Sequence, residues 1–457
     1  MRKRIWGWYF FDWASQPYHT LLVTFVFGPF FAGVAADYFM TQGLADEAAK
    51  AQAQVIWSQC LTIAGLIIGF SAPFLGAMAD ISGKRINWIT IFSVMVVIGA
   101  SGLWFMDPAG SNLWWMLASF GFGFIGAEYA LIFINAQLPS LGTKKEVGKI
   151  SGSGFAFGYL GGVFSLIIAL ALFVEQPNGK TLVGLDPIFG LNAAEKEGTR
   201  AVGPFTALWF MIFMVPYFLW VREPKGTGPR GTFGQAFGLV VTSVKNLRNR
   251  KSLTSYLVSS MFYRDSLNGL YSFGGVYAAL VLNWELTLIG AFGIIAVVSA
   301  AAFSWVGGSW DRKYGPKPVI TIAILVLILV CITVVGMDRS QIFGIAFAEG
   351  SNAPDIIFMT CGVVIGGFGG ILQSASRSLM VRHTDPEKAT ESFGLYGLSG
   401  RATAFLAPAL IAAATAATES ARLGVSPLIA LFLIGLLLLR WVKPQGDQPE
   451  WDTTASA

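Results

Sequence analysis

Long apolar runs separated by short polar stretches dominate the chain. Twelve of these runs reach the roughly 17 to 25 residues that a tilted membrane-spanning helix needs. The predicted spans are residues 6–39, 55–79, 87–106, 112–139, 150–174, 201–221, 253–282, 287–310, 317–336, 354–381, 391–417 and 423–441. The pattern therefore predicts an all-α polytopic membrane protein with twelve transmembrane helices in two pseudo-symmetric halves of six.

A polar motif interrupts the apolar pattern twice, in corresponding places. Gly76-Ala-Met-Ala-Asp80-Ile-Ser-Gly83-Lys84-Arg85 joins the second and third runs, and Gly307-Gly-Ser-Trp-Asp311-Arg312-Lys313-Tyr-Gly315 joins the eighth and ninth. Glycine permits a tight turn and close helix approach, and the bases hold the turn in the cytoplasm. A repeat at half the chain length indicates a transporter built from duplicated halves. The alternative is an ordinary basic loop on the cytoplasmic side.

The same motif supplies a first set of functional candidates. The motif resembles the loop between the second and third helices of the major facilitator superfamily, and this resemblance implies a gating loop whose residues pair neighbouring helix ends. They are Gly76, Asp80, Gly83, Lys84, Arg85, Asp311, Arg312 and Gly315. The second copy has one extra residue between Asp311 and Gly315, so it is the weaker match.

A polar stretch rich in glycine, proline and bases divides the chain. The predicted organisation is a first six-helix half at 1–221, a cytoplasmic linker at 222–251, a second half at 252–441 and a short cytoplasmic tail at 442–457. Near the end of the linker, apolar residues such as Phe237, Val240 and Val244 recur at helical spacing. This spacing predicts either a helix lying on the cytoplasmic leaflet or an extension of the seventh span.

Composition agrees with a membrane protein and narrows its partners. The 457 residues are 54% hydrophobic and 12% charged, with mean hydropathy +0.61. The isoelectric point near 9.0 would suggest nucleic acid in a soluble chain, but here most bases fall in alternate loops, which places both termini in the cytoplasm. Lipid is the expected partner and nucleic acid is not. The three cysteines lie in apolar runs without metal-ligand spacing, so neither a metal site nor a cofactor is expected.

Ionisable residues inside the spans form a second set of candidates. Each costs roughly 3 kcal/mol or more at the bilayer centre, so each needs a reason. The set is Asp12, Glu128, Arg264, Asp265, Arg377 and Arg401. The first five fall on helices one, four, seven and ten, which are equivalent members of four three-helix units. Three acids and three bases fit mutual pairing and equally fit a site for a zwitterion.

These charged residues lie at different predicted depths in the membrane. Glu128, Arg264 and Asp265 lie well inside their spans, whereas Asp12 and Arg377 lie nearer the cytoplasmic ends and can extend toward water. A carboxyl group as deep as Glu128 is costly to charge, which makes it a candidate proton carrier. The alternative for Glu128 is a fixed ion pair with Arg264 or Arg377.

The two histidines and two glycine ladders complete the pattern. His19 either joins a polar path in the first span or packs in the core, whereas a histidine at 383 in a polar loop is expected to be solvated. Glycine ladders occur in the fifth span at Gly154, Gly158 and Gly162, and in the tenth at Gly362, Gly366 and Gly370. Such ladders allow close helix packing in lipid, and in a moving protein they also allow sliding.

Several stretches resemble a known family. The Asp80 motif resembles the loop between the second and third helices of the major facilitator superfamily. The vacuole-effluxer-like branch of that superfamily is similar at Trp8-Tyr-Phe-Phe-Asp12-Trp13-Ala-Ser-Gln-Pro-Tyr18, Asn135-Ala-Gln-Leu-Pro139, Ser151-Gly-Ser-Gly-Phe-Ala-Phe-Gly158, Gly370-Ile-Leu-Gln373-Ser-Ala-Ser376-Arg377-Ser378 and Glu391-Ser-Phe-Gly-Leu-Tyr396 through Arg401. These stretches cover nearly the whole chain.

The resemblance implies both a fold and a function. It implies the major facilitator fold, in which helices one, four, seven and ten line a central cavity. It carries over as site candidates Asp12, Asn135, Asp265, Gln373, Arg377 and Tyr396. It implies amino-acid export from a storage compartment in fungal relatives, and small-solute transport of undefined direction in bacterial members. The chain departs from the family pattern at Ser15-Gln16, at Ser266, at Ser392 and at Arg401.

These observations support a secondary transporter that moves a small polar or zwitterionic solute by alternating access, with protons as a candidate coupling ion. We expect a monomer in a bacterial cytoplasmic membrane. A transporter-like sensor or scaffold is one alternative. An intramembrane enzyme is another, although the sequence lacks a Gly-x-Ser-x-Gly or His-Glu-x-x-His motif.

Overall fold

The computed structural model describes residues 2–83, 85–222, 233–284, 286–418 and 420–446. Within these ranges, ten helices are long and apolar enough to cross a membrane. They match the predicted spans except the seventh and the eleventh. The seventh predicted span is a long but more polar helix, and the eleventh is interrupted. The predicted all-helical membrane fold is therefore present.

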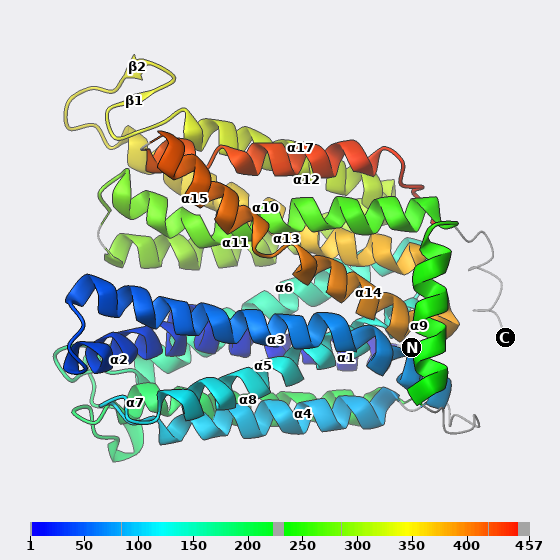
Figure 1. Ribbon diagram of the computed structural model, residues 1–457, viewed down its shortest axis with the longest axis horizontal. Coiled ribbons are helices and arrows are strands. Elements are labelled where there is room, and N and C mark those ends of the chain that lie inside the picture. The colour runs from blue at the N-terminus through cyan, green and yellow to red at the C-terminus, as the bar shows by residue number, and fades with distance from the viewer. Residues whose placement is uncertain (1, 84, 223–232, 285, 419, 447–457) are drawn as a thin grey trace. The chain divides into compact units, whose positions relative to one another are not determined.

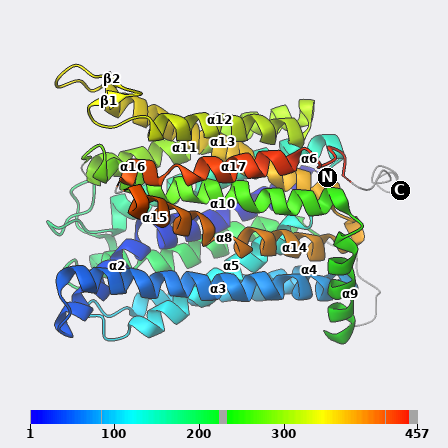
Figure 2. The ribbon, with the colours of Figure 1, turned by 45° about the horizontal axis from the view of Figure 1, so that its top comes forward.

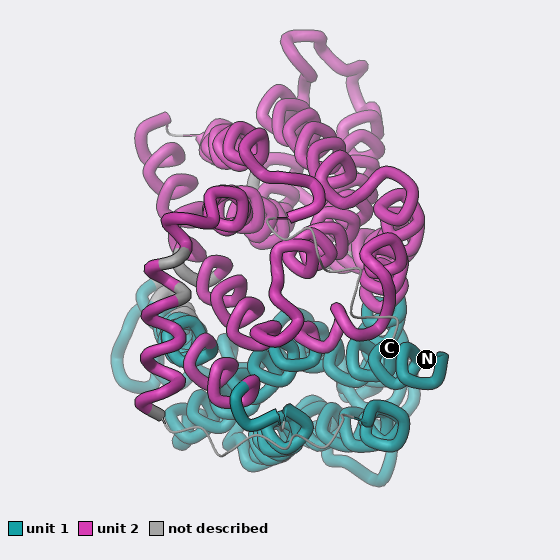
Figure 3. Tube along the Cα trace, turned by 90° about the vertical axis from the view of Figure 1, so that its right-hand side faces the viewer, with its two compact units in different colours: residues 1–72, 81–134, 157–230 teal, residues 73–80, 135–156, 231–457 magenta. Residues whose placement is uncertain are grey.

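One compact unit contains Met1–Ala72, Ile81–Ile134 and Phe157–Arg230, shown in teal in Figure 3. Its elements are α1 (Arg2–Pro17), the π-helical η1 (Tyr18–Phe25), α2 (Phe27–Thr41), most of α3 (Asp46–Ser82), α4 (Arg85–Gly102), the 3-10 helix η2 (Leu103–Phe105), α5 (Leu113–Asn135), the second half of α6 (Lys144–Ile168), the π-helical η4 (Ala169–Phe173), the short η5 (Ile188–Gly190), α7 (Glu197–Arg200) and α8 (Val202–Trp220). We call this the first unit.

The first predicted span changes its winding at Pro17, where α1 gives way to η1. Proline lacks the backbone N–H and its ring crowds the carbonyl four residues earlier, so the chain widens into a π-helix there. Two side chains hold this span against α5. Trp8 Nε1 donates to the carbonyl of Ile134 at 2.9 Å, and the Tyr18 hydroxyl donates to that of Phe120 at 2.7 Å.

The second unit contains Pro73–Asp80, Asn135–Ala156 and Gly231–Ala457, shown in magenta in Figure 3. It holds the end of α3, the 3-10 helix η3 (Leu138–Ser140), the start of α6, α9 (Phe233–Leu247), α10 (Lys251–Leu280), α11 (Leu286–Tyr314), α12 (Pro316–Val335), β1 (Gln341–Ile342), β2 (Ile345–Ala346), α13 (Ala353–His383), η6 (Pro386–Lys388), α14 (Ala389–Ala402), α15 (Leu406–Thr418), α16 (Ala421–Gly424) and α17 (Pro427–Leu439). It thus combines helix ends that precede the predicted linker with helices that follow it.

Residues 233–247 of the predicted linker form α9, which runs across α10 rather than along it (Figures 1 and 2). The rings of Phe237 and of Phe74 on α3 stack at 5.6 Å, and Val240 is buried. Residues 223–232 of the linker and 447–457 of the tail lie outside the described chain. The division into two halves, a linker and a tail stays a prediction.

Both glycine ladders lie where helices approach closely. In the second unit, a Cβ on Gly366 would collide with the carbonyl of Ala296, and one on Gly370 would lie 2.8 Å from that of Ala300, so α13 packs directly on α11. In the first unit, a Cβ on Gly158 would lie 3.2 Å from the backbone oxygen of Asp12. Packing therefore accounts for these three positions, as expected where small residues let helices meet.

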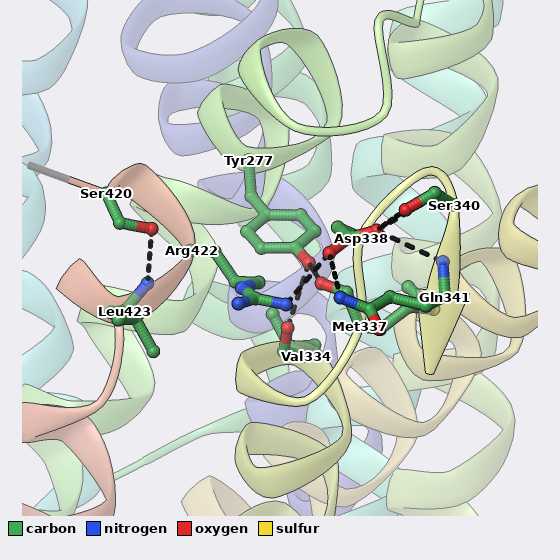
Figure 4. Close-up of polar contacts among 9 residues, drawn as sticks. All are labelled: Tyr277, Val334, Met337, Asp338, Ser340, Gln341, Ser420, Arg422 and Leu423. Atoms are coloured by element: carbon green, nitrogen blue, oxygen red, sulfur yellow. Dashed lines mark hydrogen bonds and ion pairs between the residues drawn. The ribbon is translucent and has the colours of Figure 1, made fainter. Parts of the chain in front are cut away.

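The loop after α12 forms a β-hairpin in which Gln341 pairs with Ala346 and Ile342 with Ile345. Asp338 holds the base of this hairpin (Figure 4). Its carboxylate accepts hydrogen bonds from the backbone N–H groups of Ser340 and Gln341, and it lies 2.9 Å from Nη1 of Arg422 on α16. The hydroxyl of Tyr277 on α10 lies within hydrogen-bond distance of the carbonyl of Val334, in the last turn of α12, and of the carbonyl of Met337 in the loop.

We expect Asp338 to make stability depend on acid pH. Burial by itself raises the pKa of Asp338, but the hydrogen bonds from Ser340 and Gln341 outweigh it and lower the pKa below its usual 3.8. A lowered pKa contributes stability that is present above about pH 4 and is lost as the pH falls through the folded-state pKa. The melting temperature of the wild type should therefore fall more steeply between about pH 5 and 3 than that of Asp338→Asn. Parallel curves for the two proteins would contradict this expectation.

Candidate functional site

The first unit brings His19 and Glu128 together. His19 lies on the π-helical η1 and Glu128 on α5, and the distance from Nε2 to Oε1 is 3.8 Å, with 35% and 14% of the two side chains exposed. The His19 ring also meets Phe124 edge-on at 5.9 Å. His19 is the second residue of this π-helical segment, directly after the change of winding at Pro17. Asp12, on α1 of the same unit, is 7% exposed.

In the second unit, Arg377 of α13 forms the densest polar cluster among the site candidates. Its Nε donates to Ser151 Oγ at 2.9 Å, Nη2 to the Ser151 carbonyl at 2.8 Å, and Nη1 to Asn135 Oδ1 at 3.0 Å. The guanidinium also lies 4.1 Å above the ring of Phe155. Arg377 is 3% exposed, so these contacts are desolvated. The planar guanidinium of Arg377 therefore joins α13 to the start of α6 and the end of α5 through hydrogen bonds.

Ser151 also donates a hydrogen bond to α13. Its hydroxyl donates to the carbonyl of Ser374, one turn before Arg377 on α13. The sequence pattern included Ser151 in a family motif without giving it a role. No local sequence pattern could reveal the contact between Ser151 and Arg377, because the two residues are more than two hundred positions apart in the chain.

Arg264 and Tyr396 form a second pair in the same unit. The guanidinium of Arg264 lies 4.3 Å from the centroid of the Tyr396 ring, and its Nη1 donates to the Tyr396 carbonyl at 3.2 Å. Close stacking of this kind is a cation–π contact. Gln373 of α13 donates to the hydroxyl of Tyr271 at 3.4 Å. Arg401 lies on α14, and its side chain is outside the described part of the structure.

Asp265 stabilises a break in the eleventh predicted span. The chain leaves helical geometry at residues 403–405, between α14 and α15 (Figure 2). Asp265 Oδ2 accepts the N–H of Ala407 at 2.9 Å, at the start of α15. A carboxylate suits a helix N-terminus, where backbone N–H groups lack partners and the helix dipole is positive. Interrupted helices of this kind supply binding sites in transporters.

The first gating motif forms a helix cap. Asp80, near the end of α3, accepts the N–H groups of Thr390 at 3.3 Å and Glu391 at 3.0 Å, in the first turn of α14. A Cβ on Gly76 would lie 2.6 Å from the carbonyl of Thr390, so only glycine allows this approach. Gly83 ends α3 with φ 60° and Arg85 begins α4. Lys84 lies outside the described residues.

Replacing Asp80 with Ala should weaken this cap. The loss leaves two N–H groups at the start of α14 without their carboxylate acceptor and is expected to destabilise the protein by about 1 kcal/mol. Asp80→Asn keeps an acceptor oxygen and should recover most of that loss. Melting temperatures of purified wild type and both variants check the prediction. Equal losses for Ala and Asn would show that charge rather than capping dominates.

The second gating motif makes a corresponding contact with α6. Asp311, at the end of α11, is 1% exposed and lies 3.9 Å from Nη2 of Arg382, which also donates to the Lys144 carbonyl at 3.2 Å. A Cβ on Gly148 would collide with the Asp311 carboxylate. Arg312 is exposed, and Gly315 has φ +85° before α12. In each copy, an aspartate ending one helix reaches the first turns of another.

The prediction that His383 is solvated is wrong. His383 is fully buried because α13 continues to this residue and packs on α10. Its Nε2 lies 2.8 Å from Ser252 Oγ, and its ring stacks on Tyr256 at 5.5 Å.

Two departures from the family pattern face other helices. The hydroxyl of Ser266 donates to the carbonyl of Leu428 on α17 at 2.8 Å. Gln16 lies beside Gly162 of α6, where an added Cβ would come within 2.9 Å of its Cγ. Both positions therefore contribute to helix packing. Among the described residues, no group of three or more His, Cys, Asp or Glu side chains is placed to hold a metal ion.

Comparison with known proteins adds to this geometry. Residues 49–448 match the model of the family described as "Vacuole effluxer Atg22 like". The chain belongs to this Atg22-like family. It is 24% identical over 445 residues to the uncharacterized MFS-type transporter YxiO of Bacillus subtilis, covering 96% of this chain and 94% of YxiO. It is 25% identical to Autophagy-related protein 22 of Botryotinia fuckeliana, covering 60% of this chain and 40% of the fungal protein.

Solved structures show that this Atg22-like chain has the major facilitator fold. The human organic anion transporter MFSD10 matches with a TM-score of 0.70 at 14% identity, over 96% of this chain and 99% of MFSD10. The proton:xylose symporter XylE matches with a TM-score of 0.66 at 13% identity, over 96% of this chain and 93% of XylE. The predicted family and fold class are confirmed, and the chain is a multi-pass membrane protein of the MFS transporter type. Its substrate and the roles of its site residues stay predictions.

Proposed function

We propose that this Atg22-like protein is a secondary active transporter that moves a small polar or zwitterionic solute, such as an amino acid, by alternating access. The observation that carries the proposal is the Arg377 cluster. A single buried guanidinium joins α13 to α6 and α5 through hydrogen bonds that can break and re-form without covalent change. Alternating access needs such a reversible latch between helices of the two sequence halves.

Two aspartate contacts at the same end of the second unit support this latch. Asp80 caps α14, and Asp311 lies against Gly148 in the second turn of α6. Both contacts join an aspartate that ends one helix to the start of another, where the positive end of the dipole attracts it. We propose that these contacts hold the cytoplasmic gate closed in this conformation and separate when it opens.

Solute recognition is assigned to the Arg264–Asp265 pair. Arg264 supplies a cation next to the aromatic ring of Tyr396, and Asp265 supplies an anion at the N-terminus of α15. Neighbouring charges of opposite sign suit the carboxylate and ammonium groups of a zwitterion. The acid–histidine pair Glu128–His19 is proposed as the proton-coupling site, because histidine can exchange protons near neutral pH.

The orientation follows from the charge pattern. Bases that concentrate in alternate loops support an orientation with both termini and the two gating loops in the cytoplasm. We propose a bacterial cytoplasmic membrane as the location and a monomer as the working unit.

Solute counterflow in proteoliposomes tests the proposed function. Vesicles loaded with an unlabelled amino acid should take up the same labelled amino acid transiently, because exchange needs alternating access and no driving force. A panel of amino acids and small organic acids identifies the substrate class. Exchange limited to organic acids would reject the amino-acid assignment. Failure of the whole panel, with folded protein, would favour a transporter-like sensor.

A further inference from the structure

Two loops contain the same four-residue turn, one in each unit. Ile188-Phe189-Gly190-Leu191 follows the fifth span, and Ile342-Phe343-Gly344-Ile345 follows the ninth. In both turns the phenylalanine and the glycine have positive φ, at 61° and 71° in the first and 50° and 84° in the second. Positive φ at both central positions defines a type I′ turn, which Asn-Gly or Asp-Gly normally forms.

Phenylalanine is a poor choice for this conformation. A non-glycine residue in the left-handed region costs roughly 1–2 kcal/mol, and only Asn and Asp visit it readily. Burial does not compensate for this cost, because Phe189 is 87% exposed and Phe343 is 60% exposed. A strained residue that neither the backbone nor the protein core explains points to a functional contact.

Both rings fold back to the end of the preceding helix. The N–H of Phe343 donates to the carbonyl of Gly336 at 2.7 Å, directly after α12 ends at Val335. A Cβ on Gly336 would collide with the Phe343 ring. In the first unit, the Phe189 ring lies 6.4 Å from the ring of Phe173, the last residue of η4. Each ring therefore lies level with the end of a membrane-spanning helix, and Figure 1 shows the hairpin at the end of α12.

The apolar surface around each ring continues along its helix or loop. On α12 an exposed stripe at helical spacing leads to the hairpin, through Ile322, Leu325, Leu329 and Ile332. An apolar helix face that stays exposed in a membrane protein is the face that meets lipid. In the same loop as Phe189, three more apolar residues are exposed, Leu182, Val183 and Leu185.

We propose that the two Ile-Phe-Gly turns are interfacial anchors, each placing a phenylalanine ring in the headgroup region of the bilayer at the end of the fifth or ninth span. Aromatic rings collect at this depth because they are apolar yet tolerate the polar boundary. The bilayer covers the part of each ring that the protein leaves exposed, and this contact offsets the cost of the left-handed phenylalanine. This assignment does not depend on the transported solute.

Spin-label depth measurements in proteoliposomes test the proposal. Nitroxides are attached at Phe189→Cys and Phe343→Cys after serine replaces the three native cysteines. Exposed carboxylates in the same loops provide the controls, as Glu195→Cys and Glu349→Cys. Labels at 189 and 343 should collide more often with oxygen, which concentrates in lipid, than with a water-soluble nickel chelate, and the controls should show the reverse. Nickel-dominated collisions at 189 or 343 overturn the anchor, and exclusion of both reagents there indicates a protein partner and also overturns it.

Asparagine variants separate anchoring from turn formation. Asn suits a left-handed turn position better than phenylalanine, so Phe343→Asn should keep or strengthen the hairpin while removing its lipid contact. In sealed proteoliposomes with the hairpin outside, trypsin should then cut after Arg339 several-fold faster than in the wild type. Equal or slower cleavage would show that the phenylalanine serves only the turn.

Discussion

Replacing Arg377 with Ala is expected to reduce transport at least tenfold and to open the gate region to reagents. The guanidinium is 3% exposed and donates to Ser151 twice and to Asn135 once. A hydrogen bond to a charged group contributes about 1.5–3 kcal/mol, and the substitution removes three of them. Because about 1.4 kcal/mol changes an equilibrium tenfold, the conformation described here should lose at least two orders of magnitude in population relative to one with separated helices.

Cysteine accessibility measures this shift directly. Ser374 is 2% exposed and lies one turn before Arg377. A Ser374→Cys reporter should react slowly with an impermeant maleimide in inverted vesicles, and the added Arg377→Ala change should speed that reaction. Arg377→Lys keeps the charge but loses the planar fork, so an intermediate rate is expected. Arg248→Ala, which removes an exposed base just after α9 and outside the gating motifs, is the matched control.

The latch assignment for Arg377 has a clear contradicting outcome. If Arg377→Ala and Arg248→Ala give the same labelling rate, the Arg377 cluster contributes nothing to closure. If labelling is unchanged but counterflow is lost, Arg377 acts on the solute instead.

Glu128→Gln is expected to abolish proton-driven accumulation while leaving exchange within about twofold. Glutamine keeps the size and hydrogen-bonding capacity of the side chain but cannot carry a proton. A gradient of two pH units stores about 2.7 kcal/mol per proton, enough for roughly 100-fold accumulation with one coupled proton. The wild type should approach this ratio under a pH gradient, and the variant should stop at equal concentrations on the two sides.

Two further variants sharpen the coupling test. His19→Gln removes the basic ring 3.8 Å from Glu128 and should weaken accumulation, because the carboxylate then loses its proton-exchanging neighbour. Glu349→Gln removes an exposed carboxylate in the loop before α13 and should change nothing. Full accumulation by Glu128→Gln would assign coupling elsewhere or show that transport is not driven by protons.

Hydrophobic length and the repeated motif were sufficient to predict the fold. Each apolar run needs a helix because a lipid environment offers no partners for backbone N–H and C=O groups. The seventh and eleventh predicted spans are the two that do not form single apolar helices, and polar residues explain both. Helix α10 contains Arg264 and Asp265, and the eleventh predicted span breaks where Asp265 caps α15. No local signal located that break, since its stabilising carboxylate comes from another helix.

The sequence by itself determined the helical membrane fold and the identity of the unusual charged residues, because these depend on local composition and spacing, and its motifs resembled the family that the comparison confirmed. Only the tertiary structure decided which partners those residues meet. It paired His19 with Glu128, placed Ser151 around Arg377, turned Asp80 into a cap for α14 and buried His383. Such contacts join residues far apart in the chain, and their geometry depends on how helices pack rather than on any local pattern.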